Sequence, residues 1–371
     1  MFRRGGIAVL CAALCVGAVW TRPPVLMRAP AGEAYVELDP AGRTILPNGR
    51  FITPAGRMIR VLPHPYGLTI SPDGRWIITA CSQGPMLSIL DVADPRQPIE
   101  YRIPENAGEG EGVLDACFMG LAVDPSNRTV YVAGGRDYSI MAFDLETRTR
   151  LFRIDCAHET AGLTFPQGYI GDIRLSSDGG TLYAVDQSNF RLVIVDVPGR
   201  RVLRSIPVGR YPFGITLSPD GTRAYIANVG IYEYAYFRDR DGAVAKLDFP
   251  PFGVPSREAQ EGFVMDGVKI PGLGDPNDIR GMSVWTVDIS QRGAEKVIAK
   301  TKTGHLVGEQ LEDFPAVGGS SPNSVVATSR YVYVSNGSND SISVIDARTG
   351  LRVKDIDLTL DPAVDHLRGV I

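Results

Sequence analysis

Short runs of alternating apolar and polar residues recur along the chain, and turns rich in Pro, Asp and Gly close them. Alternation with a period of two is typical of β-strands. Four segments share the same strand and turn: Gly67–Gly74, Gly120–Ser126, Asp172–Gly179 and Gly214–Gly221. A second strand follows each turn, and a third strand ends in an aspartate. The pattern therefore predicts a repeat built from antiparallel strands.

The distance between the turn and this aspartate gives the register of the repeat. It is 18 residues from Asp73 to Asp91, from Ser126 to Asp144, from Asp178 to Asp196 and from Thr328 to Asp346. In one further unit, Asp220 to Asp288 is 68 residues, which is 18 plus an insertion of 50. Four short strands repeated at about 40 to 50 residues indicate the blades of a β-propeller. We expect the aspartates to be structural, since a short acceptor after a strand can bind the amides of the next turn.

The sequence thus predicts an all-β fold, a β-propeller of four-stranded antiparallel blades with five complete blades and a half blade. The strand pair Arg50–Thr53 and Arg57–Leu62 is expected to supply the half blade. Complete blades are expected at about 66–104, 117–156, 169–208, 213–304 and 321–358, with the insertion at about 229–281. Before the incomplete propeller of residues 43–371, we expect a signal peptide or N-terminal anchor at 1–20 and a linker at 21–42.

The N-terminal segment has the order of charge and apolarity found in secretory signals. Arg3 and Arg4 precede Gly5–Trp20, sixteen residues without a charge. Such a run is short for a membrane-spanning helix and suits the apolar region of a signal peptide. Cleavage after Ala18 fits the small residues there, and Ala29-Pro-Ala31 is another candidate. A periplasmic or secreted location follows from either. A membrane contact is expected only if this segment stays uncleaved as an anchor.

Composition and cysteine usage narrow the functional classes. The 371 residues carry 38 basic and 42 acidic side chains, a formal net charge of −4, which argues against a dominant nucleic-acid footprint. Three cysteines follow the N-terminal segment, Cys81, Cys117 and Cys156. An oxidising compartment permits a bridge between two of them, and buried free thiols are the alternative.

Several motifs resemble the YVTN repeat family, which includes YncE-like proteins. They are Tyr225–Asn228, Tyr333–Asn336 and Ser341–Asp346. A more specific resemblance covers the fourth unit, in Asn228–Tyr234, Pro271–Asp275 and Val317–Ser324. These segments are similar to the propeller half of bifunctional proteins in which a YncE-like propeller precedes an alkaline-phosphatase-like domain. The resemblance spans about residues 40–371. It implies a C-terminally truncated chain, a parent ring of seven blades and a partner domain such as a phosphoesterase.

The insertion is the main candidate for a binding surface. In a propeller, the loops between blades and those between the second and third strands emerge on one face, which we call the insertion face. Long loops in compact domains are often functional, and aromatic and arginine side chains are common anchors of interfaces. A decorative loop that packs on its own propeller is the alternative. The candidate ligand-binding residues on this face are Tyr232, Tyr234, Arg238, Arg240, Asp275 and Asn277.

Catalytic and metal motifs are scarce. The four histidines are widely separated, and His158-Glu159 lacks a second histidine at zincin spacing. Neither a catalytic residue nor a cofactor is predicted. Carboxylates in one connector are weak candidates for a hard cation, and a solvated acidic loop is the alternative. These carboxylates are Glu109, Glu111 and Asp115.

These observations predict an exported binding or scaffold module that presents the insertion face to a protein domain or a small ligand. Two other classes stay open. One is a propeller enzyme, a lactonase or quinoprotein-like oxidoreductase, which needs acid/base or metal groups gathered at the channel. The other is single-stranded nucleic-acid binding, which needs a basic groove with stacking aromatics. Only Tyr236–Arg240 combines aromatic and basic residues as such a groove requires.

Overall fold

The structure is a computed structural model of the chain, and it divides into two compact units, Met1–Arg60 and Val61–Ile371. Among the described residues, no helix is long and apolar enough to cross a membrane. The structure describes residues 30–39, 42–53, 56, 58–81, 84–104, 114, 116–233, 256–311 and 314–358.

The N-terminal unit contains one hairpin, and it differs from the predicted half blade. Strand β2 (Phe51–Ile52) pairs with β1 (Thr44–Ile45), which precedes it, and residues 58–62 contain no strand. The turn explains the difference. Gly49 adopts φ 73°, and the Asn48 carboxamide oxygen accepts a hydrogen bond from the Arg50 amide at 3.1 Å. Asn-Gly supplies the positive φ of a tight hairpin, so the strand pair forms around residues 46–50 and not around Pro54–Gly56.

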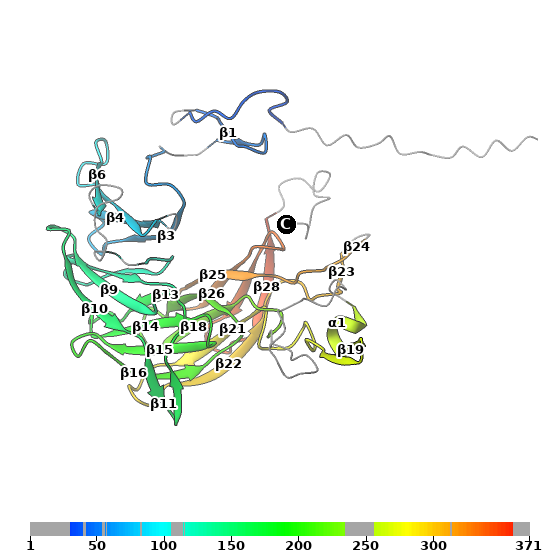
Figure 1. Cartoon of the computed structure of the whole chain (residues 1–371). Coiled ribbons are helices and arrows are strands. Elements are labelled where there is room, and N and C mark those ends of the chain that lie inside the picture. The colour runs from blue at the N-terminus through cyan, green and yellow to red at the C-terminus, as the bar shows by residue number, and fades with distance from the viewer. Residues whose placement is uncertain are drawn as a thin grey trace, which may run out of the picture. The chain divides into compact units, whose positions relative to one another are not determined.

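The second unit contains five sheets of four antiparallel strands, and these confirm the predicted blades (Figure 1). The first blade consists of β3 (Pro65–Ile70), β4 (Trp76–Cys81), β5 (Met86–Asp91) and β6 (Ile99–Ile103). The second consists of β7 (Leu121–Val123), β8 (Thr129–Ala133), β9 (Ser139–Asp144) and β10 (Arg150–Asp155). The third consists of β13 (Ile170–Leu175), β14 (Thr181–Asp186), β15 (Arg191–Asp196) and β16 (Arg201–Pro207). The last two consist of β17 (Pro212–Leu217), β18 (Arg223–Asn228), β21 (Ser283–Asp288) and β22 (Lys296–Lys302), then β25 (Pro322–Ala327), β26 (Tyr331–Asn336), β27 (Ser341–Asp346) and β28 (Arg352–Asp357).

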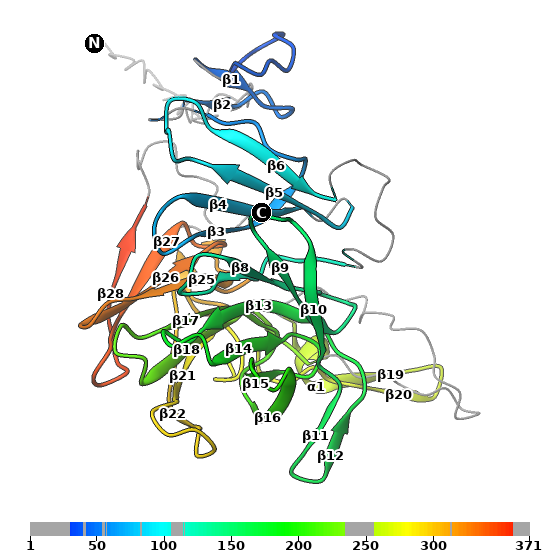
Figure 2. The ribbon, with the colours of Figure 1, turned by 90° about the vertical axis from the view of Figure 1, so that its left-hand side faces the viewer.

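Smaller elements occupy the connections. The hairpin of β11 (His158–Thr160) and β12 (Leu163–Phe165) joins the second and third blades (Figure 2). The insertion of the fourth blade, residues 229–282, contains α1 (Arg257–Glu261) and the hairpin of β19 (Gly262–Met265) and β20 (Val268–Pro271). The strands β23 (Gln310–Leu311) and β24 (Phe314–Pro315) lie between the fourth and fifth blades. The insertion therefore falls between the second and third strands of its blade, as the spacing predicts.

Neighbouring residues of the central strands point into different interfaces between blades. In β9, Ile140 and Ala142 belong to the apolar cluster shared with the third blade, whereas Met141 and Phe143 belong to the cluster shared with the first. The middle of these central strands is therefore mainly apolar, because both of their faces are buried. At about 25 cal/mol per Å² of buried apolar area, these interfaces are the main source of the stability of the unit.

The repeated turn between the first two strands has a fixed hydrogen-bond pattern. The Ser71 hydroxyl donates to Asp73 at 2.5 Å and accepts from the Trp76 amide at 2.9 Å. The same pattern recurs in the third and fourth blades. In the second blade the aspartate comes first and accepts the strand amide, and the serine comes second and donates to it. In the fifth blade, Thr328 accepts from the Tyr331 amide at 2.9 Å, so it takes the place of the serine and not of the aspartate.

The aspartates that end the third strands are structural, which confirms the prediction. Asp144 lies opposite Thr129, the first residue of the second strand. Its carboxylate accepts the amides of Glu146 and Thr147 at 2.9 and 2.8 Å and pairs with Arg128 at 2.7 Å. The equivalent carboxylates of Asp91, Asp288 and Asp346 also accept turn amides.

We predict that Asp144→Ala lowers the free energy of unfolding by about 1–3 kcal/mol, because the turn amides lose a charged acceptor. The Thr147 amide, and after it Arg128, hold the pKa of Asp144 at about 2, below its usual 3.8. The contribution is therefore complete above about pH 3.8 and lost as the pH falls through about 2. Urea unfolding at several pH values measures it. Glu146→Gln, at a side chain that is 62% exposed, is the control and should change stability by less than about 0.5 kcal/mol. Equal effects of the two variants contradict the assignment.

Candidate functional site

The innermost strands of three blades begin with a proline, an extra residue and a small residue. These are Pro65-Tyr66-Gly67, Pro212-Phe213-Gly214 and Pro322-Asn323-Ser324. The pairing register shifts between the first and third residue of each triplet, so the middle residue is bulged out of the ladder. Bulges re-aim a side chain next to sites of function. Here they turn Tyr66, Phe213 and Asn323 toward a cavity that the innermost strands line.

Four aromatic side chains gather where these strands begin. The Phe118 ring centroid lies 5.6 Å from that of Tyr66, 5.1 Å from Tyr169 and 6.3 Å from Phe213, and the last two pairs are edge-on. Such edge-to-face geometry is favourable for aromatic pairs. The four residues come from the first, second, third and fourth blades, or from the segments that lead into them. We call this group the aromatic mouth.

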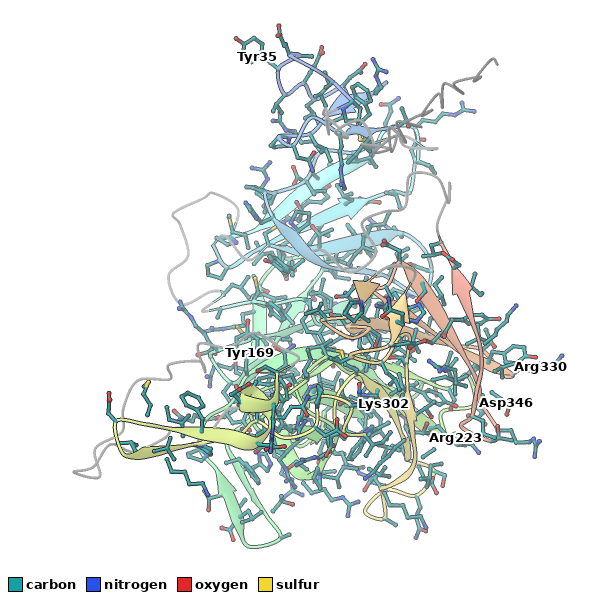
Figure 3. The ribbon with its side chains drawn as sticks, turned by 90° about the vertical axis from the view of Figure 1, so that its right-hand side faces the viewer. Tyr35, Tyr169, Arg223, Lys302, Arg330 and Asp346 are labelled. Atoms are coloured by element: carbon teal, nitrogen blue, oxygen red, sulfur yellow. The ribbon has the colours of Figure 1, made fainter. Side chains whose placement is uncertain are left out.

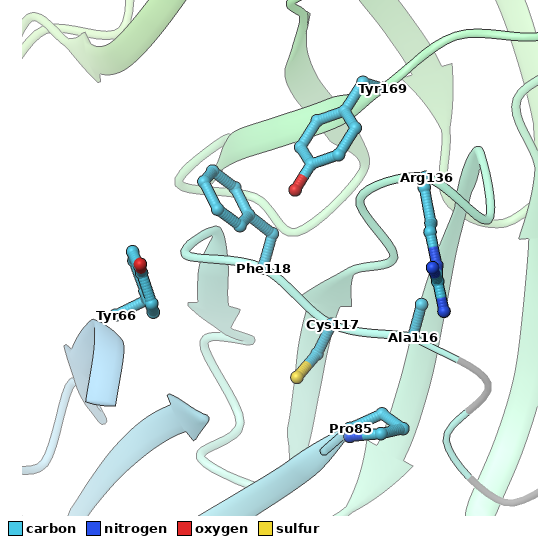
Figure 4. A pocket seen from close by; sticks show the side chains of 7 residues that line it. All are labelled: Tyr66, Pro85, Ala116, Cys117, Phe118, Arg136 and Tyr169. Carbon is cyan, nitrogen blue, oxygen red and sulfur yellow. The ribbon is translucent and has the colours of Figure 1, made fainter. Parts of the chain in front are cut away.

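A cavity of about 380 Å³ opens beside the aromatic mouth (Figure 4). The rings of Tyr66, Phe118 and Tyr169 follow one another along one side of it, and Arg136 stands at the other side. Its lining residues are Tyr66, Pro85, Ala116, Cys117, Phe118, Arg136 and Tyr169. Arg136 belongs to the loop between the second and third strands of the second blade, which places the cavity on the insertion face.

A second cavity, of about 290 Å³, lies between the innermost strands, and we call it the channel cavity. Tyr66 lines both cavities. All five blades contribute to the wall of the channel cavity. Its lining residues are Tyr66, Gly67, Leu68, Met119, Asp172, Arg174, Phe213, Gly214, Asn323, Ser324 and Val325.

Asp172 and Arg174 provide the charge in the channel cavity. The two side chains form an ion pair at 2.8 Å, with Asp172 4% exposed and Arg174 38% exposed. The Asp172 carboxylate also accepts the Ile173 amide at 2.9 Å and the Ile215 amide of the next blade at 3.1 Å. Burial raises the pKa of Asp172, and Arg174 and the two amides oppose that shift.

Cys117 is a partly buried thiol and not a reactive nucleophile. Its Sγ donates to the Cys81 carbonyl oxygen at 2.9 Å, and burial raises the pKa of the thiol to about 11. At neutral pH it is therefore protonated. Cys81, Cys117 and Cys156 are all free thiols in the structure, which is the second of the two alternatives that the sequence leaves open.

The insertion is held at its base by two cationic side chains. Arg210 donates to the Ile231 carbonyl oxygen at 2.6 Å, and its amide donates to the Arg280 carbonyl oxygen at 2.6 Å. The Lys302 ammonium donates to the carbonyl oxygens of Gly281 at 2.7 Å and Asp278 at 3.3 Å (Lys302 is labelled in Figure 3). Burial lowers the pKa of Lys302 to about 8, with Asp275 and Asp278 opposing the shift and Arg210 adding to it.

The described candidates from the sequence have local structural contacts. Tyr232 is 1% exposed, so its ring belongs to the interior and is not a surface anchor in this structure. Asp275 accepts the Asn277 amide at 2.8 Å within a turn. The Asn277 side chain donates to the Val307 carbonyl oxygen and accepts the Val307 amide, each at 2.9 Å, which ties the insertion to the next connector. The structure brings these three residues to the base of the insertion and not to either cavity.

The other predicted residues lie outside the described part of the chain. They are Tyr234, Arg238 and Arg240 in the insertion, and Glu109, Glu111 and Asp115 in the first connector. Within the described residues, no three His, Cys, Asp or Glu side chains are grouped so that they could hold a metal ion.

His158 anchors the β11–β12 hairpin. Its Nδ1 lies 2.8 Å from the Cys156 carbonyl oxygen and its Nε2 lies 2.7 Å from the Ser205 hydroxyl on β16. The Arg191 guanidinium donates to the same hydroxyl at 2.6 Å. His158 and Arg191 both pack on the Phe165 ring. Ser205 is 4% exposed and neither mapped cavity reaches it, so this group holds the hairpin to the blade.

Sequence reasoning did not find the aromatic mouth or the Asp172–Arg174 pair. The signal was present in the repeated Pro-aromatic-Gly of the first and fourth blades. Asp172 also stands where the aligned repeats have Gly67, Gly120 and Gly214. A charged residue at a position that glycine or serine holds in the other blades is visible when the repeats are aligned.

Comparison with solved structures finds chains of similar fold. Hydrazine synthase of Kuenenia stuttgartiensis is 16% identical, with 79% of each chain covered and a TM-score of 0.39. U3-55K is 10% identical, with 81% of this chain and 67% of that chain covered and a TM-score of 0.47. The β-propeller domain of Cps50 (Swd1) from Myceliophteria thermophila is 12% identical, with 81% and 87% covered and a TM-score of 0.41. No protein-family model and no curated protein match the chain.

We predict that Lys302 titrates near pH 8. In ¹³C-methyl NMR after reductive methylation, the resonance that disappears in Lys302→Met should have its midpoint at about 8. Between pH 8 and 10.5 the unfolded chain binds the extra proton, so the free energy of unfolding should rise with pH in that window. Lys302→Met should flatten this rise. A midpoint at the ordinary value near 10.5 contradicts the burial of this ammonium beneath the insertion.

Proposed function

We propose that this chain is an exported binding module that takes an aromatic group of a small ligand or of a partner chain in the cavity beside the aromatic mouth. The observation that carries the proposal is the convergence of Tyr66, Phe118, Tyr169 and Phe213 from four parts of the repeat onto one opening. A concave site that combines aromatic side chains with a few placed polar groups is a usual form of a small-ligand pocket. The β-propeller fold supports a binding or scaffold module in general.

The chemistry of the lining favours binding over catalysis. Asp172 is the carboxylate among the lining residues of the two cavities, and three donors already occupy it. Cys117 is held as a protonated thiol. A general base needs a free lone pair within reach of the substrate, and a nucleophile needs activation. The side chains that are free to act here are aromatic rings and guanidinium groups, which bind ligands.

We predict that benzyl alcohol, as a neutral aromatic probe, binds the purified chain in ligand-observed NMR. Phe118→Ala should weaken this binding by about fivefold or more, because the central ring of the mouth is lost. Tyr331→Ala is the matched control. Tyr331 packs edge-on against Tyr333 at 6.3 Å on the fifth blade and lines neither the cavity beside the aromatic mouth nor the channel cavity. Equal loss in the two variants, with unchanged melting temperatures, argues against the mouth as the binding site.

We also propose that residues 1–20 direct export and that the propeller belongs with the YncE-like repeat proteins. Two features support this, the basic start with its uncharged run and the repeated Tyr-x-x-Asn strand ends. A partner domain such as a phosphoesterase, on this or another chain, is then a candidate occupant of the insertion face.

The proposed export predicts a periplasmic product when the full chain is expressed in a Gram-negative bacterium. Its N-terminus, read by intact mass, should follow Ala18. Replacing Arg3 and Arg4 with glutamate should keep the chain in the cytoplasm, because the basic start of the signal is lost. A full-length cytoplasmic product from the unaltered chain excludes the signal assignment.

A further inference from the structure

We propose that the cavity at the aromatic mouth and the channel cavity form one site for an aromatic carboxylate, with the ring in the mouth and the carboxylate on Arg174. The inference rests on the proposed binding function and names its ligand class. Three observations carry it: the free edge of Arg174, the position of Asp172, and the sharing of Tyr66 between the two cavities.

The Arg174 guanidinium uses only one of its three nitrogens in hydrogen bonds to the described residues. One nitrogen, Nη1, donates to the Asp172 carboxylate at 2.8 Å and to the Ile173 carbonyl oxygen at 2.7 Å. Its Nε and Nη2 make no hydrogen bond to the described residues. The side chain is 38% exposed and lines the channel cavity. Two adjacent N–H groups on a planar cation match a carboxylate in bidentate geometry.

Asp172 holds this guanidinium in place and leaves two of its nitrogens available for hydrogen bonds. Its position corresponds to Gly67, Gly120 and Gly214 of the other repeats, so its side chain stands between two innermost strands. Two backbone amides share its negative charge with Arg174. Asp172 is therefore a positioning residue that holds one end of Arg174. Its charge also competes with an incoming anion for the same cation.

The two cavities together suit a ligand with a ring and an acid. Tyr66 is 55% exposed and lines both, so a ring against Tyr66 and Phe118 is next to the space that contains Arg174. Arg136 adds a second cation at the outer opening and makes no hydrogen bond to the described residues. The positive charge of Arg136 and Arg174 disfavours the binding of a protonated aromatic amine. An aliphatic acid would lack the ring contacts of the mouth.

Three probes separate these contributions: benzoate, benzyl alcohol and cyclohexanecarboxylate. Each is titrated into the full chain at neutral pH, with binding read by ligand-observed NMR. We expect benzoate to bind at least about tenfold more tightly than either of the other two, since it alone provides both the ring and the charge.

Two variants of the ion pair should act in opposite directions. Arg174→Gln should remove the advantage of benzoate over benzyl alcohol and leave benzyl alcohol within about twofold of its original affinity. The Ile173 and Ile215 amides bind different oxygens of the Asp172 carboxylate. Asp172→Asn keeps an oxygen acceptor for one of these amides and removes the competing charge, so it should strengthen benzoate binding by about threefold or more. A structural disturbance alone would weaken both probes in both variants.

A matched arginine variant serves as the control. Arg128→Gln breaks a comparable ion pair, with Asp144, away from the cavities and should leave both affinities unchanged. Arg136→Gln tests the second cation of the site, and it should weaken benzoate binding less than Arg174→Gln does, because the exposed charge of Arg136 is screened by water. Loss of benzoate binding in Arg136→Gln, with none in Arg174→Gln, overturns the channel assignment.

The outcomes distinguish this inference from the proposed function. Benzyl alcohol binding that depends on Phe118, without a preference for benzoate, leaves the proposed function in place and overturns the carboxylate site. Absence of binding by all three probes overturns both. A preference for benzoate that survives Arg174→Gln shows that another cation holds the acid, and the inference is then wrong.

Discussion

The close approach of neighbouring innermost strands is the constraint on which the rest of the second unit depends. A Cβ built on Gly67 would stand 1.9 Å from the Met119 carbonyl oxygen, and one built on Gly214 would stand 2.5 Å from the Asn323 carbonyl oxygen. These backbones meet only because no side chain separates them. A proline and a bulged residue precede each of these glycines, so the strand leaves its ladder just before it passes its neighbour.

The charged side chains of the channel cavity lie where a residue other than glycine occupies this close approach. In the third blade an aspartate replaces the glycine, and its carboxylate reaches the Ile215 amide on the next strand. The contact between the third and fourth blades thus includes a buried carboxyl group, and Arg174 pairs with it. One substitution in the repeat therefore accounts for a buried acidic side chain, an oriented guanidinium and a polar wall beside the aromatic rings.

Local periodicity determined most of the fold, and so the sequence could predict it. The five blades, the insertion point and the structural aspartates such as Asp144 depend on strand and turn patterns within about 20 residues. The aromatic mouth depends on residues from four repeats that meet only in three dimensions, and no local pattern signals that meeting. Tyr232 illustrates the converse case. A tyrosine in a long loop suggests an exposed anchor, yet the ring of Tyr232 is buried.

The two ends of the insertion lie next to each other at the edge of an intact blade. Asn228 pairs with Ser283 across residues 229–282, just as Asn336 pairs with Ser341 across residues 337–340. The sheet therefore tolerates either connection without a change of register. Such a joint acts as a cassette site, where a long loop can be exchanged for a four-residue turn.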